Sequence, residues 1–302
     1  MNPKIQAAFA ALAAVTSLST FASAKEPLAI GANPEALTRG FAGKLYVSIM
    51  GETRTEGDGN GGITVIEAGV PKVFCSGMDD PKGIVMLGDF LVTTDFKKLW
   101  KVDKEGKKEL LAGPQDFPHP PLFLNDVVLA PDGKSILVTD MGARDRMMDP
   151  AGNLWPVDSE EAKALPVMGR VYRVNLDGKI TEVIAPNPEM PCPNGIDVLA
   201  DGTVRIAEFF KGNILQREGQ DWKTIATGHR SADGIVHDSK GRFYVSEVKT
   251  GRVTRYEADG SGQTELGKNL GLQSAADLFL DEENGMLIVP DTKGGKLFFI
   301  GL

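Results

Sequence analysis

The sequence predicts an all-β fold, a six-bladed β-propeller, and three observations lead to this prediction. Stretches of alternating apolar and polar residues recur along the chain and are separated by turns rich in Gly and Asp. A unit of four such stretches, about 40 residues long, repeats along the chain. The composition, with 42% hydrophobic and 25% charged residues, 35 Gly and 18 Pro, is typical of a globular protein with a large core and many turns.

The repeating unit is clearest where it begins at Asp233, with the strands "IVHD", "RFYVSE", "RVTRYE" and "QTELG". Related copies follow Glu35, Asn125, Asn194 and Asp277, and a less regular one follows Lys82. Six copies of a four-stranded unit indicate a propeller of six blades. A β-sandwich with fortuitous internal similarity is the alternative.

The last copy contains only three strands before Leu302, whereas the segment "EPLAIGA", residues 26–32, precedes the first copy and has no place in it. We expect this N-terminal strand to complete the last blade and close the ring. Closure in this way hides two strand edges that would otherwise be exposed.

Residues 1–24 have the features of a signal peptide: Lys4, an apolar stretch and the small-residue pattern Ala22-Ser23-Ala24. Cleavage near Ala24 would leave residues 25–302 as a single propeller domain in the periplasm or outside the cell. The apolar stretch is too short and too rich in Ala and Ser for a comfortable membrane span, although an uncleaved anchor is the alternative.

The charge and cysteine content limit the partners of this chain. The net charge is −8 and no basic block is present, which argues against nucleic acid. Cys75 and Cys192 fall near different blades, so we expect unpaired thiols, although an oxidising compartment would permit a disulfide. A closed propeller needs no partner to hide strand edges, and we therefore expect a monomer.

The first position of each copy is the strongest candidate for a functional site. The first strand of every blade lines the central channel of a propeller, so the side chains that begin these strands meet at one mouth. We call these residues the ring: Glu35, Lys82, Asn125, Asn194, Asp233 and Asp277. In four of the copies, the second strand begins ten residues after the ring position, which fixes the register.

Five of the six ring residues carry oxygen, the ligand atom that hard divalent cations prefer. Glu35, Asn194 and Asp233 would supply two carboxylates and one neutral carbonyl. Ca²⁺ is the expected ion, with Mg²⁺, Mn²⁺ or Zn²⁺ as alternatives. The three histidines are scattered, which disfavours a zinc or copper site built from soft ligands.

Two other patterns have competing interpretations. Asp-Gly and Asn-Gly pairs also form tight turns, and this interpretation fits the pairs at 132, 177, 201 and 259. A second row of acids follows the ring positions by thirteen to fifteen residues: Asp95, Asp140, Glu208, Glu247 and Asp291. These acids would either support a metal shell through water or hold loops.

An insertion at residues 141–168 interrupts the third copy, and we expect it to act as a lid over the mouth. The Pro-rich segment 113–123 approaches Asn125 from the same side, and together they predict an apolar wall. Arg144 and Arg146 would bind an anionic substrate group or pair with nearby acids.

Three segments, "PNGIDVLADG", "ADGIVHDSKGRFYVSE" and "LNDVVLAPDG", resemble the SMP-30/gluconolactonase/LRE family of metal-dependent lactonases. The resemblance implies that Glu35, Asn194 and Asp233 bind the cation. It also implies that Asn125 faces the substrate.

Departures from the family pattern bear on the substrate. Sugar-lactonase members carry an Arg two residues before the substrate Asn, where this chain has Phe123. This difference argues against a highly polar or anionic substrate. It implies a small molecule less polar than a sugar lactone, bound by Phe123 and by the remaining ring residues Lys82 and Asp277.

The expected function is a secreted hydrolase that opens a lactone or a related ester. A bound divalent cation would polarise the carbonyl and stabilise the oxyanion, and Asp233 would take a proton from the attacking water. The chain has no Gly-x-Ser-x-Gly motif that would indicate a serine hydrolase. The alternative is a non-catalytic propeller that binds a small ligand or a protein.

Overall fold

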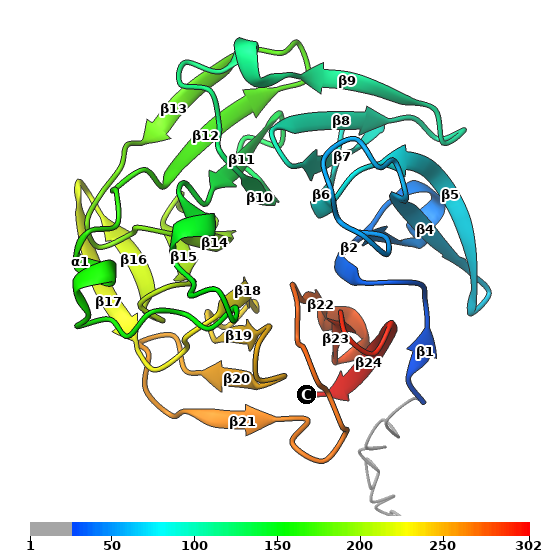
Figure 1. Cartoon of the computed structure of the whole chain (residues 1–302). Coiled ribbons are helices and arrows are strands. Elements are labelled where there is room, and N and C mark those ends of the chain that lie inside the picture. The colour runs from blue at the N-terminus through cyan, green and yellow to red at the C-terminus, as the bar shows by residue number, and fades with distance from the viewer. Residues whose placement is uncertain (1–25) are drawn as a thin grey trace, which may run out of the picture.

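The computed structural model describes residues 26–302 and confirms the six-bladed β-propeller. Six four-stranded antiparallel sheets surround a central channel (Figure 1). The predicted signal peptide lies outside the described residues. No helix within residues 26–302 has the length and apolar character needed to cross a membrane.

The first three blades follow the chain from the channel outward. Blade 1 contains β2 (Pro34–Arg39), β3 (Leu45–Ile49), β4 (Gly61–Glu67) and β5 (Val70–Met78). Blade 2 contains β6 (Pro81–Leu87), β7 (Phe90–Asp95), β8 (Lys98–Val102) and β9 (Lys108–Ala112). Blade 3 contains β10 (Leu124–Leu129), β11 (Ser135–Asp140), β12 (Arg170–Asn175) and β13 (Ile180–Ile184).

The other three blades repeat this order. Blade 4 contains β14 (Pro193–Val198), β15 (Val204–Glu208), β16 (Ile214–Glu218) and β17 (Asp221–Ala226). Blade 5 contains β18 (Ala232–His237), β19 (Phe243–Glu247), β20 (Val253–Tyr256) and β21 (Thr264–Leu266). Blade 6 contains β22 (Phe279–Asp281), β23 (Met286–Asp291), β24 (Lys296–Gly301) and β1 (Leu28–Ala29).

Helical segments in the described chain are single turns. Four are 3₁₀ turns, namely η1 (Phe41–Gly43), η2 (Pro114–Asp116), η3 (Arg144–Arg146) and η4 (Glu282–Asn284). The α-helical turn α1 (Glu160–Lys163) begins at Ser159, whose side chain accepts a hydrogen bond from the backbone of Ala162.

The outermost strand of blade 6 comes from the other end of the described chain. β1 pairs with β24 in antiparallel register, with Leu28 opposite Leu297, and the backbone N–H of Ile30 donates to Gly295 (2.9 Å). This strand lies within the segment 26–32 that was expected there.

The hydrophobic core is divided among the interfaces between blades. Each blade packs against a neighbour on both faces, so alternate side chains of one strand are buried on opposite sides. One cluster, for example, joins blades 2 and 3 through Val92 and Tyr172. Cys75 and Cys192 are buried in different clusters and both are free thiols, as expected.

A charged pair joins the inner strands of blades 4 and 5. His237 Nδ1 lies 2.8 Å from Asp197 Oδ2, and this hydrogen bond raises the pKa of His237 above its ordinary value of 6.5. The folded protein therefore holds this proton more tightly than the unfolded chain. The resulting stability is fully present below about pH 6.5 and is lost as the pH rises through the folded pKa.

We expect His237→Gln to lower the free energy of unfolding by about 1 kcal/mol near pH 6 and much less near pH 9. Urea unfolding at the two pH values measures this difference. His119→Gln is the control, because the side chain of His119 is 55% exposed. Equal losses at both pH values would contradict the prediction.

Candidate metal and substrate site

The ring residues are positioned by the same irregularity in five blades. In β14, the pairing register jumps from Pro193 to Ile196, so that Asn194 and Gly195 form a bulge. The same jump follows the first residue of β2, β6, β10 and β18. β-Bulges change the direction of a side chain at the edge of a sheet, and here they occur at the ring position of each strand.

The glycines that follow Asn194 and Asp233 allow neighbouring blades to pack closely, whereas turn glycines are needed for their positive φ. A Cβ atom at Gly195 would lie 2.1 Å from the carbonyl oxygen of Asp233, so glycine permits blades 4 and 5 to approach closely. By contrast, Gly202 of a predicted turn has a φ of 89°, which favours glycine. The distinction between ring and turn pairs is therefore confirmed.

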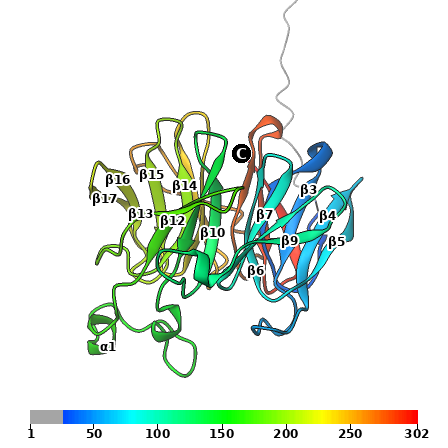
Figure 2. The ribbon, with the colours of Figure 1, turned by 90° about the horizontal axis from the view of Figure 1, so that it is seen from above.

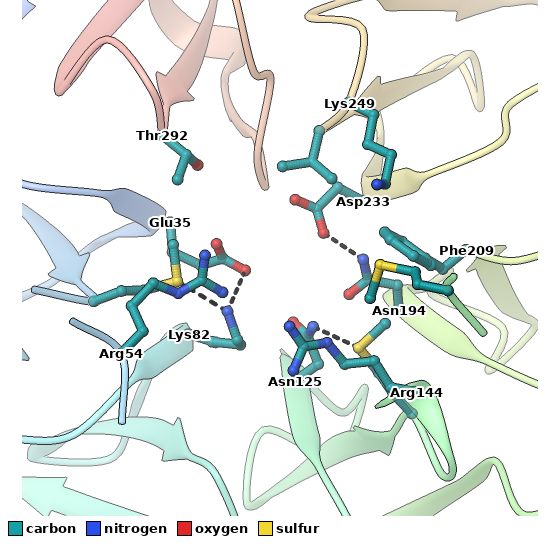
Figure 3. Close-up of a pocket in the computed structure, with 14 residues that line it drawn as sticks. Glu35, Arg54, Lys82, Asn125, Arg144, Asn194, Phe209, Asp233, Lys249 and Thr292 are labelled. Carbon is teal, nitrogen blue, oxygen red and sulfur yellow. Dashed lines mark hydrogen bonds and ion pairs between the residues drawn. The ribbon is translucent and has the colours of Figure 1, made fainter. Parts of the chain in front are cut away.

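Five ring residues line one pocket of about 230 Å³ at the mouth of the channel (Figure 3). They are Glu35, Lys82, Asn125, Asn194 and Asp233. The rest of the lining comes from loops and the insertion: Met50, Arg54, Met141, Arg144, Met148, Phe209, Val248, Lys249 and Thr292. Asp277 and Phe123, which were predicted to bind substrate, are not part of this lining.

Asn194 and Asp233 form a bonded pair in the pocket. The Asn194 amide nitrogen donates to Asp233 Oδ1 and to the carbonyl of Ala232 (3.1 Å). The Asn194 carbonyl oxygen is buried and has no hydrogen-bond partner among residues 26–302. A buried acceptor without a partner is costly, and a bound cation would satisfy it.

Several buried acidic side chains lie close together in the channel. Burial raises the pKa of Asp233 well above its ordinary value, and the nearby carboxylate of Glu35 raises it further. The pKa of Asp277 is raised in the same way, by burial and then by the charge of Asp126. Burial raises the pKa of Asp126 itself to about 7. These acids repel one another, which favours a cation among them.

Lys82 is a cation already present in the pocket. Its side chain is 4% exposed, and its Nζ atom lies 3.6 Å from Glu35 Oε1 and 3.7 Å from Asp80 Oδ1. Its hydrogen-bond partner is the sulfur of Met50 (2.9 Å), which is a weak acceptor. The ammonium group therefore offsets part of the acidic charge.

The donor set fits a hard divalent cation. Glu35 and Asp233 provide carboxylate oxygens, and Asn194 provides a neutral oxygen without another partner. No group of three or more His, Cys, Asp or Glu side chains within residues 26–302 is arranged to hold a metal. A site here would thus depend on the amide oxygen of Asn194.

The second row of acids holds loops. All five residues end the second strand of a blade, and none lines the pocket. Glu208, for example, accepts hydrogen bonds from the backbone of Cys192 (3.1 Å) and Phe210 (3.1 Å). Asp95, Asp140 and Asp291 likewise accept backbone N–H groups from the segment that leads into the inner strand, and Glu247 contacts His229 of the corresponding segment.

The insertion 141–168 lies over the pocket side of the propeller. It contains α1 and projects from one face of the propeller (Figure 2). Its residues Met147 and Trp155 belong to one apolar cluster with Phe209 and Phe210, which follow β15 of blade 4. Arg230 also donates to the carbonyl of Trp155 (2.7 Å), which attaches the insertion to the propeller.

A second cavity, of about 470 Å³, adjoins the pocket and shares Arg144 with it. Its lining includes Phe96, Leu122, Phe123 and the exposed Arg146. The apolar wall predicted from segment 113–123 therefore lies here, through Leu122 and Phe123. The Phe123 ring supports the Arg144 guanidinium, which lies 4.2 Å from the ring centroid.

Sequence reasoning missed several residues of the site. Arg54 and Lys249 come from loops that carry no repeat signal. Asp126 comes directly after the ring residue Asn125. In the copies that begin with Asn194 and Asp233, the corresponding position is a glycine. Its carboxylate accepts a hydrogen bond from Ile196 of the next blade (2.8 Å), and its polarity at a glycine position was a detectable signal.

Comparison with solved structures finds the same fold at low sequence identity. A gluconolactonase from Xanthomonas campestris is 19% identical, with a TM-score of 0.67 over 91% of this chain and 88% of that one. The calcium-binding protein regucalcin from Agrobacterium tumefaciens is 17% identical, with a TM-score of 0.62 over 91% of each chain. Virginiamycin B lyase from Staphylococcus aureus is 16% identical, with a TM-score of 0.59 over 90% and 81%.

No curated protein sequence matches the chain. The family profile described as "SMP-30/Gluconolactonase/LRE-like region" matches residues 72–268, more than half of the chain. The resemblance carried by the Asn-Gly and Asp-Gly ring motifs is thereby confirmed. This chain belongs to the SMP-30/gluconolactonase/LRE-like family.

Proposed function

We propose that this protein is a metal-dependent hydrolase that opens a lactone or a related ester. The observation that carries the proposal is the unpartnered carbonyl oxygen of Asn194, which lies in a pocket with the buried carboxylates of Glu35 and Asp233. Membership of a family that includes gluconolactonases supports lactone hydrolysis as the reaction.

Glu35, Asn194 and Asp233 would hold the cation, for which Ca²⁺ is our first choice. When bound, a divalent cation polarises a carbonyl group and stabilises the negative charge that develops on its oxygen. Asp233 would accept the proton of the attacking water. Its carboxylate lines the same pocket as the other proposed ligands, which is the position that a general base requires.

Asn125 and Lys82 would orient the substrate. The Asn125 amide nitrogen donates to the sulfur of Met141 (2.9 Å), and Lys82 donates to the sulfur of Met50 (2.9 Å). Thioether sulfurs are weak acceptors, so a substrate oxygen would replace them at little cost. Both donors thus favour a ligand rich in oxygen at the ring.

The substrate would be small, with an apolar portion. The pocket of about 230 Å³ is smaller than the sites that usually bind drug-sized ligands, roughly 300–1,000 Å³. The neighbouring cavity beside Phe123 would accept an apolar substituent. This arrangement supports a compound less polar than a sugar lactone over much of its surface.

The function is tested by screening γ- and δ-lactones with varied substituents against EDTA-treated and metal-restored protein. We expect hydrolysis only after Ca²⁺, Mg²⁺, Mn²⁺ or Zn²⁺ is restored, and one tightly bound ion per chain by calorimetry. The absence of both metal binding and hydrolysis would instead support the non-catalytic propeller.

Secretion belongs to the same proposal. We infer cleavage near Ala24, which would release a soluble monomer into the periplasm or the medium. N-terminal sequencing of the exported protein tests the cleavage site, and size-exclusion chromatography tests the monomer. Retention of the intact N-terminus would contradict this inference.

A further inference from the structure

Arg144 presents an unpaired cation to the pocket. Its guanidinium stacks on the Phe123 ring at 4.2 Å and makes no hydrogen bond or ion pair with any side chain or backbone group of residues 26–302. Burial lowers the pKa of Arg144 from its ordinary value, and the nearby charge of Arg54 lowers it further. An arginine nevertheless remains protonated, so its donors lack a partner.

Arg54 approaches the same space from the loop between β3 and β4. Its Nε atom donates to Asp80 Oδ1 (3.1 Å), which leaves both terminal nitrogens of the guanidinium without a hydrogen-bond partner in the described chain. Figure 3 shows the guanidinium groups of Arg54 and Arg144 turned toward the pocket from two sides. Asp80 pairs with Arg54, and Asp80 and Glu35 offset part of the charge of Arg144, but the free donors of both guanidinium groups remain available to an anion.

The pocket is therefore polarised along its depth. The acids Glu35 and Asp233 are only 4% and 5% exposed and lie at its base. Arg54 and Lys249 are more exposed and lie nearer to solvent, with Arg144 only partly buried. Lys249 also donates to the carbonyl of Gly152, so this cation faces both the insertion and the pocket. The base favours a cation, whereas the mouth favours an anion.

We propose that the substrate carries a carboxylate, which Arg144 and Arg54 bind at the mouth while the reacting carbonyl lies at the ring. A guanidinium matches the planar geometry of a carboxylate through paired hydrogen bonds. The small pocket limits the ligand to a short ring compound with this group near the lactone. The substrate class rests on the hydrolase function proposed above, whereas anion binding can be measured without turnover.

The kinetic experiment compares a γ-lactone that bears a ring carboxylate with the same lactone bearing a carboxamide. We expect the wild-type kcat/KM to favour the carboxylate by about 30-fold or more, since a desolvated charge pair is strongly coupled. Arg144→Gln and Arg54→Gln should each reduce this preference by about tenfold or more, chiefly through KM. Arg173→Gln is the control, because it removes one positive charge from an ion pair with Asp132 that does not line the pocket.

The binding experiment uses cyclopentanecarboxylate and cyclopentanecarboxamide, which contain no ester bond. Calorimetry should show binding of the carboxylate to wild type and to Arg173→Gln, and weaker binding to Arg144→Gln. Arg144-dependent binding without hydrolysis of any lactone would overturn the hydrolase and retain the anion site. Equal hydrolysis of both lactones with no binding of cyclopentanecarboxylate would overturn the anion site and retain the hydrolase. Tighter binding of inorganic phosphate than of the carboxylate would overturn the choice of a carboxylate.

Discussion

Replacing Asp233 with asparagine is expected to lower kcat for lactone opening by about 10²–10⁴-fold and to weaken divalent-cation binding. The substitution preserves the shape of a buried side chain but removes both a carboxylate ligand and the proposed general base. Steady-state kinetics with the best lactone of the panel and calorimetry with Ca²⁺ measure the two effects. Circular dichroism should show an unchanged fold.

Asp277→Asn is the matched comparison for this variant. Asp277 is also a ring residue with a raised pKa, but it does not line the pocket. We therefore expect Asp277→Asn to weaken cation binding much less than Asp233→Asn does. If Asp233→Asn kept full activity, or if both variants lost cation binding equally, the role assigned to Asp233 would be wrong.

Replacing Lys82 with methionine is expected to tighten Ca²⁺ binding by about tenfold or more. The ammonium group lies 3.6 Å from Glu35 Oε1 and competes with any cation for this carboxylate. Two unit charges about 4 Å apart interact by roughly 4 kcal/mol at an effective dielectric constant of 20, and a third of that energy corresponds to a tenfold change in affinity. Calorimetry of EDTA-treated protein with Ca²⁺ measures the change.

The same variant should unfold at a lower temperature in EDTA, because removing Lys82 leaves the buried carboxylate of Glu35 without its cation. Added Ca²⁺ should reverse this loss. Lys101→Met is the control, since Lys101 belongs to the same blade but pairs with the largely exposed Glu109. Weaker Ca²⁺ binding by Lys82→Met would mean that the lysine assists the site instead of competing with its cation.

The architecture and the ring could be predicted because both depend on regular spacing. The second residue of the inner strand lines the pocket in blades 1 to 5, so Asn194 and Asp233 could be matched by register alone. Asp277 fits that register but lies outside the lining, because β22 begins only at Phe279, beyond the ring position. Register predicts the position of the backbone, while the local strand conformation decides where the side chain points.

The residues at the mouth could not be predicted in this way. Arg54 reaches the pocket from a connection whose length and conformation differ from blade to blade. Arg144 was considered a possible anion ligand, but its position over Phe123 depends on the packing of the whole insertion. Phe123 occupies the position at which sugar-lactonase members carry an Arg, and this difference suggested a less polar pocket. Instead, the phenylalanine supports an arginine that comes from elsewhere in the chain.

The close approach of blades 4 and 5 at Gly195 has a consequence for the evolution of this protein. Because no side chain fits between Gly195 and the Asp233 carbonyl, the diameter of the ring is set jointly by neighbouring blades. A substitution that widened one contact would displace the ligands of the next blade, so the base of the pocket tolerates few changes. Loops such as the insertion at 141–168 are free of this constraint. New substrates would therefore arise through changes at the mouth, while the chemistry at the base stayed the same.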